Sequence, residues 1–434
     1  MNLTTAAIVG IVVQLILMAL GMNIGLAMMV VGFVGYGLVM NWKAAFGLLQ
    51  TVPYTQAASY TMTVVPLFIM MGNFAFASGM SANLYDMANK WIGRLPGGLA
   101  CATVAACACF GAICGSTNAT TATMSVVAIP EMRRFGYDDS LATGCVAVGG
   151  GLGIMIPPSS CLIVYGIMSE LSIGRLFAAG ILPGIILAIL IIGVIVLQVK
   201  MKPSLAPKGE KFTWKERWMS IAKCWDVLIL FIGVFAAMFT GFFTINEAAA
   251  AGAMLALIIM ACKRMLNWKS FSKVMWDSVK TTSMTYLIVI GAMVFSGFLS
   301  ITQLPMKLAA TIEGLDVSRY LILAVIVLIY LVMGCFMDAL PMIMLTVPIF
   351  LPIIEGLGFD GIWFGVMIII VMMMGLITPP VGMNCYVLSG IIKDVSLGTI
   401  FRGAVPYVIA LLIGAVIITI WPDLALVIPN ALYG

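Results

Sequence analysis

The chain consists of long apolar stretches that carry almost no charge. Between residues 172 and 199, for example, the one charged side chain is that of Arg175. About 20 apolar residues form a helix that can cross the hydrocarbon core of a bilayer, and stretches of that length recur along the chain. They are too long for the short alternating strands of an outer-membrane barrel. The sequence therefore predicts an all-α polytopic membrane protein with roughly ten to twelve helical elements.

Composition excludes several other classes. Only 9% of the 434 residues are charged, whereas soluble domains carry about a quarter. The first 20 residues lack the basic start and cleavage site of a signal peptide, so they should form a retained helix. There is no histidine, and the ten cysteines lie mostly in apolar stretches without the spacing of metal ligands, which favours a packing role over zinc or haem. No phosphate-binding P-loop occurs, so we expect neither ATP hydrolysis through such a loop nor an enzyme, and we expect no nucleic-acid partner.

The distribution of basic residues predicts the orientation in the membrane. The hydrophilic segment 200–223 holds seven basic and two acidic residues, and the positive-inside rule places it in the cytoplasm. Threading the chain from there puts 18 of the 22 basic residues inside. Both termini are then periplasmic, and the outside basic residues are Lys43, Arg175, Lys307 and Arg319.

Two apolar segments must return to the side from which they enter. The segment at about 97–130 has basic residues before it and after it, which predicts a re-entrant hairpin from the cytoplasm. The segment at about 320–354 is flanked by outside segments, so it should be a second hairpin that enters from the opposite face.

The two halves also resemble each other. The sequence PEMRRFGYD at Pro130 matches PIIEGLGFD at Pro352, and GIMIPP at Gly153 matches GLITPP at Gly375, both at an offset of 222. An odd number of crossings before the basic segment would invert the second half. We therefore predict an inverted repeat: residues 1–199, a cytoplasmic basic linker at 200–224, and residues 225–434.

The predicted turn of the first hairpin is polar. Residues 115–121 read GSTNATT in the middle of an apolar segment. Irregular backbone at membrane depth is tolerated where it is buried in protein or lines a cavity, so this turn predicts an ion or substrate site. The alternative is that these hydroxyls only bond back to the helix or allow close helix contact.

The predicted turn of the second hairpin, residues 334–341 (GCFMDALP), contains Asp338. A charge at that depth costs about 2.5–3.5 kcal/mol or more on insertion scales, so it is expected to have a partner. Asp338 could coordinate a cation, or it could cap the returning arm of the hairpin; the two roles are compatible.

Each half also contains a double proline, Pro157-Pro158 and Pro379-Pro380. Proline removes a backbone donor and breaks a helix, which frees carbonyls that can coordinate sodium, while the N-termini of the half-helices can face an anion. The substrate candidates are Ser116, Thr117, Asn118, Ser159, Ser160 and Asn384. The sodium candidates are Gly115, Ser116, Gly153, Pro157, Gly334, Asp338, Thr378, Pro379 and Gly382.

No Lys or Arg lies in the interior of a predicted membrane element, so an anionic substrate would be held by helix N-termini, hydroxyls and bound cations. The absence of histidine and the scarcity of buried carboxylates favour sodium coupling over a proton relay. An intramembrane aspartyl protease that uses Asp338 would need a second deep Asp and a Gly-x-Gly-Asp context, and the sequence shows neither.

Five stretches resemble the large membrane subunit of tripartite ATP-independent periplasmic (TRAP) transporters, and they cover both halves. They are VPLFIMMG (65–72), FGAICGS (110–116), GLGIMIPPS (151–159), GILPG (180–184) and GLITPPVG (375–382). The chain departs from the family pattern at Thr117-Asn118, where a second Ser and a small residue are expected. The triplet at 116–118 is instead similar to the Ser-Asn-Thr turns of divalent-anion/sodium symporters, which share the architecture.

The resemblance implies an elevator-type ion-transporter fold, in which a domain with both hairpins and both broken helices slides against a scaffold. It further implies a small four-helix membrane subunit on a separate chain, a periplasmic binding protein that delivers a carboxylate, and a gradient of sodium, two or more ions per cycle. The expected location is the bacterial inner membrane. The alternative is a stand-alone sodium/dicarboxylate symporter of the same fold.

Overall fold

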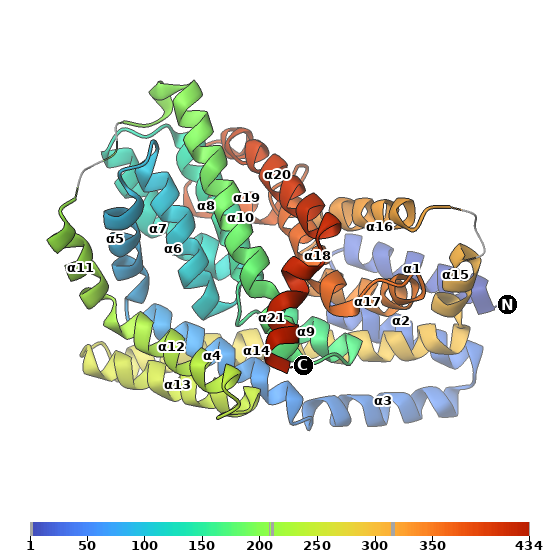
Figure 1. The fold of residues 1–434 in the computed structure, drawn as a ribbon. Helices are drawn as coiled ribbons and strands as arrows, with labels where there is room; N and C mark the ends of the chain where they lie inside the picture. The colour runs from blue at the N-terminus through green and yellow to red at the C-terminus, as the bar shows by residue number, and fades with distance from the viewer. Residues whose placement is uncertain (1–2, 208, 210–211, 314–316, 434) are drawn as a thin grey trace.

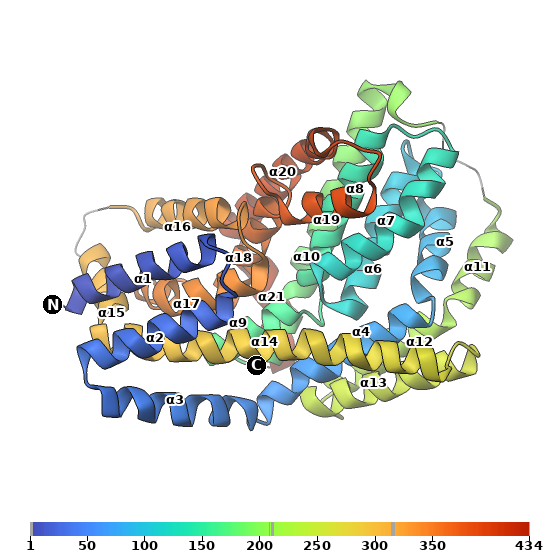
Figure 2. The same cartoon turned by 180° about the vertical axis from the view of Figure 1, so that it is seen from behind.

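The computed structural model describes residues 3–207, 209, 212–313 and 317–433, and every regular element in these ranges is a helix (Figures 1 and 2). Lys208, Glu210 and Lys211 of the predicted linker, and the chain ends at Met1, Asn2 and Gly434, lie outside the described residues. The helices are α1 (Leu3–Ala19), α2 (Ile24–Val39), α3 (Trp42–Ala57), α4 (Val64–Ala77), α5 (Met80–Ile92), α6 (Gly98–Cys114), α7 (Thr117–Arg134), α8 (Asp139–Gly151), α9 (Ser160–Ser169), α10 (Ile173–Met201), α11 (Trp214–Lys223), α12 (Trp225–Phe239), α13 (Ile245–Cys262), α14 (Trp268–Thr302), α15 (Leu304–Glu313), α16 (Arg319–Gly334), α17 (Ala339–Gly356), α18 (Gly361–Gly375), α19 (Met383–Ile391), α20 (Leu397–Ile420) and α21 (Asp423–Tyr433), with short 3-10 turns η1 (Thr61–Thr63), η2 (Leu152–Ile154) and η3 (Pro203–Leu205).

Several helices are long and apolar enough to cross a bilayer, which agrees with the predicted multi-pass membrane protein. Within the described residues there are five such helices, or up to seven if the bent pairs α3–α4 and α11–α12 each count as one span. The five are α10, α13, α14, α17 and α20. The all-helical polytopic class is therefore confirmed.

Hydropathy missed the shorter helices. The helices α3, α5, α11, α15 and α21 lie where no helix was expected, and α11 occupies the C-terminal part of the predicted linker. In α3, α5, α11 and α15 polar residues interrupt the apolar ones, and α21 is only 11 residues long, so no long apolar stretch marks these helices. Similarly, α14 begins 14 residues before the apolar stretch at 282–302, because Asn267 caps it and forms a capping box with Ser270.

Both predicted hairpins are pairs of contacting helices, α6–α7 and α16–α17. The first pair turns at Gly115, which adopts a left-handed conformation with φ +61°, and at Ser116, whose hydroxyl caps α7. The second pair turns through residues 335–338, and Asp338 caps α17. The first hairpin extends to Arg134, four residues beyond the predicted end at 130.

Both double prolines lie in breaks between helices. The first break follows α8 and η2 and ends where α9 begins at Ser160. The second separates the end of α18 at Gly375 from the start of α19 at Met383. The helices before the breaks form the centre of the molecule, since every residue of α18 and every residue of α8 from Leu141 onward is buried.

The two halves share one order of elements. The bent pair α3–α4 begins after Asn41 and α14 begins after Asn267, and in each half a short helix, a hairpin, a broken helix and a long helix follow. The bend between α3 and α4 is 57°, whereas α14 is one helix of 35 residues. The inverted orientation of the two halves stays a prediction.

The halves are interlocked around their hairpins. The returning arm of the first hairpin, α7, contacts α19 of the second half, and the returning arm of the second hairpin, α17, contacts α9 of the first half. The helices α3, α4, α12, α13 and α14 lie along the lower edge of both views (Figures 1 and 2). The contacts of α7 with α19 and of α17 with α9 bring both hairpin turns and both helix breaks together.

Candidate functional site

Three hydrogen bonds link the N-terminal ends of four helices. The Asn118 Nδ2 atom in the first turn of α7 donates to Asp338 Oδ2, 3.1 Å away, at the start of α17. The Ser160 backbone N–H, at the start of α9, donates to the Gly115 carbonyl at 3.3 Å. The Gly382 N–H, just before α19, donates to the Cys335 carbonyl at 3.2 Å. The N-termini of α7, α9, α17 and α19 therefore meet where the two hairpin turns meet.

The two backbone hydrogen bonds that join a hairpin turn to a helix break occupy equivalent places in the repeat. Ser160 and Gly382 each lie two residues after a double proline, at an offset of 222. Close glycine contacts accompany them: a Cβ on Gly111 would lie 2.5 Å from the Gly153 Cα atom, and a Cβ on Gly375 would lie 2.6 Å from the Gly334 Cα atom. In each half a hairpin arm therefore touches the helix end just before the break.

Asp338 caps a helix and contacts the other half of the chain. Its Oδ1 atom accepts the Ala339 backbone N–H at 2.8 Å, which is the capping role foreseen from the sequence. Its Oδ2 atom accepts from Asn118, and within the described residues it forms no ion pair. The carboxylate is thus fixed by two hydrogen bonds while its charge has no basic counterpart.

The hydroxyls beside the first break have structural partners. The Ser159 side chain is fully buried; it donates to the Ile154 carbonyl at 2.5 Å and accepts the Leu162 N–H at 3.2 Å. The Ser160 hydroxyl donates to the Gly115 carbonyl at 2.7 Å. These bonds close the break, so Ser159 is the substrate candidate with the least capacity for a ligand.

Other candidate hydroxyls likewise bond to the backbone. The Ser116 hydroxyl accepts the Ala119 N–H at 3.4 Å, and the Thr378 hydroxyl donates to the Met374 carbonyl at 2.6 Å. Thr117 is buried. The alternative reading of these residues as helix caps and back-bonding groups therefore accounts for part of the polar cluster.

Three buried oxygens near the meeting point have no hydrogen-bond partner among the described residues. They are Asn118 Oδ1, Thr121 Oγ1 and Asn384 Oδ1. The Asn384 Nδ2 atom donates to the Ala147 carbonyl of α8 at 2.9 Å. The Thr121 hydroxyl occupies space beside Gly150 of α8, which a side chain at that position would fill. Buried polar atoms are normally paired, so these oxygens are available to a cation, a water or a substrate donor.

Thr121 was missing from the site residues predicted by sequence. It lies one turn after Asn118 in the polar run 115–121, and that helical spacing could have indicated it.

The prolines proposed as sodium candidates differ in exposure between the two halves. Pro157 is buried, whereas Pro379 is exposed, so the second break is the more open one.

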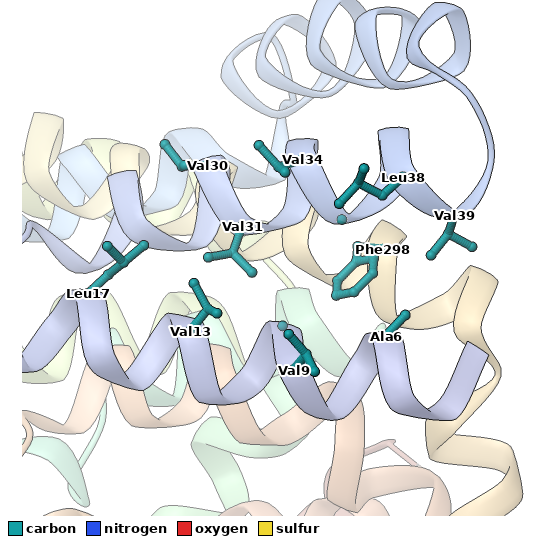
Figure 3. Close-up of a pocket in the computed structure, with 12 residues that line it drawn as sticks. Ala6, Val9, Val13, Leu17, Val30, Val31, Val34, Leu38, Val39 and Phe298 are labelled. Carbon is teal, nitrogen blue, oxygen red and sulfur yellow. The ribbon is translucent and has the colours of Figure 1, made fainter. Parts of the chain in front are cut away.

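Of the larger cavities in the described part of the chain, one contains a candidate site residue. An apolar crevice of about 460 Å³ between α6, α10 and α12 reaches Pro157. A cleft of about 590 Å³ with polar lining, including Glu170 and Asn246, separates α9 and α10 from α13. A third pocket, of about 180 Å³ between α1 and α2, is lined by valines and Phe298 and contains none of the candidate residues (Figure 3).

The sequence matches one protein family along almost its whole length. Residues 11–424 match the family described as "Tripartite ATP-independent periplasmic transporter, DctM component". The C4-dicarboxylate TRAP transporter large permease protein DctM of Pseudomonas aeruginosa is 36% identical over 374 residues, which are 86% of each chain. The 2,3-diketo-L-gulonate TRAP transporter large permease protein YiaN of Escherichia coli is 32% identical and covers 94% of this chain and 95% of its own. The sialic acid TRAP transporter large permease protein SiaM of Vibrio cholerae is 29% identical, over 87% of this chain and 88% of its own.

Solved transporters share the fold at low identity. The YdaH transporter of Alcanivorax borkumensis superposes with a TM-score of 0.58 at 14% identity, over 88% of this chain and 89% of its own. MtrF of Neisseria gonorrhoeae gives 0.60 at 15% identity, over 87% and 84%. The family match and the relatives above identify the class of protein: the chain belongs to the DctM component family of TRAP transporters and is a large permease subunit.

Proposed function

We propose that the chain catalyses the sodium-coupled uptake of an organic acid across the bacterial inner membrane. It would act with a small four-helix membrane subunit and a periplasmic binding protein, with both of its own termini in the periplasm. The observation that carries the proposal is the convergence of four helix N-termini and Asp338 where the two hairpin turns meet.

The helix N-termini supply the attraction for an anion. Each carries about half a positive charge and free backbone N–H groups, so the starts of α7, α9, α17 and α19 favour a carboxylate. Among the described residues no Lys or Arg pairs with Asp338. Positive charge for the substrate would therefore come from helix ends and bound cations.

The oxygens at the same place suit sodium. A carboxylate at Asp338, amide oxygens at Asn118 and Asn384, and the carbonyls freed by the two breaks are oxygen ligands of the kind that broken helices offer to Na⁺. Two or more ions would lower the electrostatic cost of bringing an anionic substrate beside Asp338. Sodium binding would then precede or accompany substrate binding.

The relatives support the substrate class and the partners. Their names specify C4-dicarboxylates, 2,3-diketo-L-gulonate and sialic acid, all of which are organic acids. The match to the DctM component favours a three-part system over the stand-alone symporter considered above. An elevator would move the hairpins and broken helices as one body against α2, α4, α13 and α14.

The proposal is tested with the three proteins together in proteoliposomes. An inward sodium gradient should drive accumulation of a carboxylate that the binding protein carries. Equal uptake in potassium with a proton gradient would reject sodium coupling, and no uptake of any carboxylate under either gradient would reject the substrate class.

Asp338→Asn separates the two roles of that residue. Asparagine is also a good helix cap, so insertion and thermal stability should be close to wild type. Loss of the charge should weaken the dependence of uptake on sodium concentration. An unchanged sodium dependence would leave Asp338 as a cap.

A further inference from the structure

Helix α11 carries an apolar face that is largely exposed among the described residues. On α11, Trp214 and Trp218 are 66% and 61% exposed, and Trp225, just beyond the helix, is 43% exposed. Together with Ile221, Trp214 and Trp218 follow the spacing i, i+4 and i+7, so these three residues share one side of α11. Figure 1 shows α11 at the left edge of the molecule.

The adjoining side of α11 is fixed to the protein. Ser220 and Cys224 are buried, and the Arg217 Nε atom donates to the Lys90 carbonyl of α5 at 3.2 Å. The Trp91 indole of α5 donates to the Arg217 carbonyl at 3.3 Å. The Trp91 ring also meets Trp214 and Trp218 edge to face, at centroid distances of 6.3 and 5.9 Å. The uncovered face is thus presented by a helix with a defined orientation.

This face continues into a membrane-facing surface. The axis of α11 bends by 61° from that of α12, which starts at Trp225. Along α12 the exposed side chains Ile229 and Ile232 carry the same apolar strip onward. A helix that bends away from an apolar helix and exposes its tryptophans suits the bilayer interface, where tryptophan is favoured.

The charges around the face are mainly basic. Lys215 and Lys223 of α11 are exposed, Lys215 beside the tryptophan face and Lys223 at the end of the helix on the side away from it, and Arg94 follows α5. The opposing carboxylates are engaged: Glu216 accepts from Thr213 in a capping box, and Asp86 pairs with Lys90 at 2.7 Å. Arg217 lies over the Trp214 ring at 5.1 Å.

We propose that α11 is an interfacial helix that binds anionic phospholipid. Its tryptophan face enters the boundary between headgroups and acyl chains, and Lys215 and Lys223 contact the phosphates. Because α11 is bonded to α5, and α5 leads into the first hairpin, lipid binding holds the start of that hairpin at the level of the membrane surface.

The test uses the full chain in nanodiscs that contain brominated lipid, which quenches tryptophan on contact. Brominated phosphatidylglycerol should quench wild-type emission more than brominated phosphatidylcholine at equal content. Trp214→Phe/Trp218→Phe should lose this quenchable emission, whereas Trp363→Phe, at a site only 1% exposed, should lose emission that lipid does not quench.

Lys215→Gln/Lys223→Gln should abolish the preference for the anionic lipid. Each lysine near an anionic surface raises the affinity for it about fivefold, so the pair should account for about 25-fold in affinity. The matched control is Lys43→Gln/Lys307→Gln, two exposed lysines on other helices, which should retain the preference. Equal quenching by the two lipids overturns the proposal, and so does shielding of the tryptophans from lipid when the small membrane subunit is added, since that would assign the face to a protein partner.

Discussion

Asn118 and Asp338 are 220 residues apart in sequence and are joined by a hydrogen bond of 3.1 Å between the turns of two hairpins. Both residues come from turns that the sequence marked as polar. The bond places one carboxylate and one amide at the boundary between the two halves, and it makes the two turns a single unit.

Asn118→Asp should destabilise the protein in potassium. A second carboxylate would then face Asp338, and the lost charge-assisted hydrogen bond alone should cost about 1.5–3 kcal/mol. Thermal unfolding in detergent measures the effect, and adding Asp338→Asn to the same chain should restore stability. A variant as stable as wild type would show that the bond contributes nothing.

The glycine contacts beside the breaks should tolerate no side chain. Gly111→Ala and Gly375→Ala would each place a Cβ within 2.6 Å of another backbone, so each should lower the free energy of unfolding by about 1–3 kcal/mol. Gly193→Ala in α10 has nothing within 4 Å of the added atom and should be neutral or stabilising. Equal unfolding temperatures for the three variants would contradict this account.

Lys263→Met should destabilise the protein, because it leaves a buried carboxylate without its partner. The Lys263 Nζ atom lies 2.6 Å from Asp226 Oδ2, and the Asp226 side chain is fully buried while that of Lys263 is 21% exposed. Removing one partner of a buried pair costs about 3–5 kcal/mol, and the partial exposure favours the lower end. The double variant Lys263→Met/Asp226→Asn should regain part of the loss in a thermal unfolding experiment; no recovery would mean that the lysine acts through its packing.

The ion pair between Arg133 and Asp394 should stabilise the protein near neutral pH and should be lost in acid. The Arg133 Nη1 atom donates to Asp394 at 2.7 Å, and this bond lowers the pKa of the Asp394 carboxyl below its ordinary value. A lowered pKa in the folded state stabilises the fold above the ordinary pKa of about 3.9, and the effect is lost as pH falls through the folded value. The difference in unfolding temperature between wild type and Asp394→Asn should therefore be constant near neutral pH and shrink below about pH 4. If this difference in unfolding temperature increased as the pH fell, the assignment would be contradicted.

Much of the architecture could be predicted from hydropathy and proline. The long apolar stretches correspond to α10, α13 and α20, and the double prolines correspond to the two breaks. The helices α5 and α11 escaped prediction because hydropathy detects burial in lipid, and these helices mix polar and apolar residues along their length. Their stability comes from caps and tertiary contacts that no sequence window contains.

The roles of the candidate site residues stay predictions, although part of their arrangement was foreseen. The polar turn and Asp338 were named from sequence, and the structure brings Asn118 to Asp338. The buried bonds of Ser159 could not be foreseen, because the acceptor at Ile154 belongs to the irregular backbone of the break. Nor could the unpaired oxygen of Thr121, which depends on the space that Gly150 leaves on a neighbouring helix.

The exchange of contacts between hairpin arms and broken helices has a consequence during synthesis. The arm α7 is complete at Arg134, but its partner α19 is complete only at Ile391. At roughly 5–20 residues per second a ribosome needs on the order of 13–50 s to make the intervening chain. During that interval the bonds of Ser160 to Gly115 hold the polar turn of the first hairpin within its own half. The nascent protein therefore carries an unfinished polar surface inside the membrane until about the last tenth of translation.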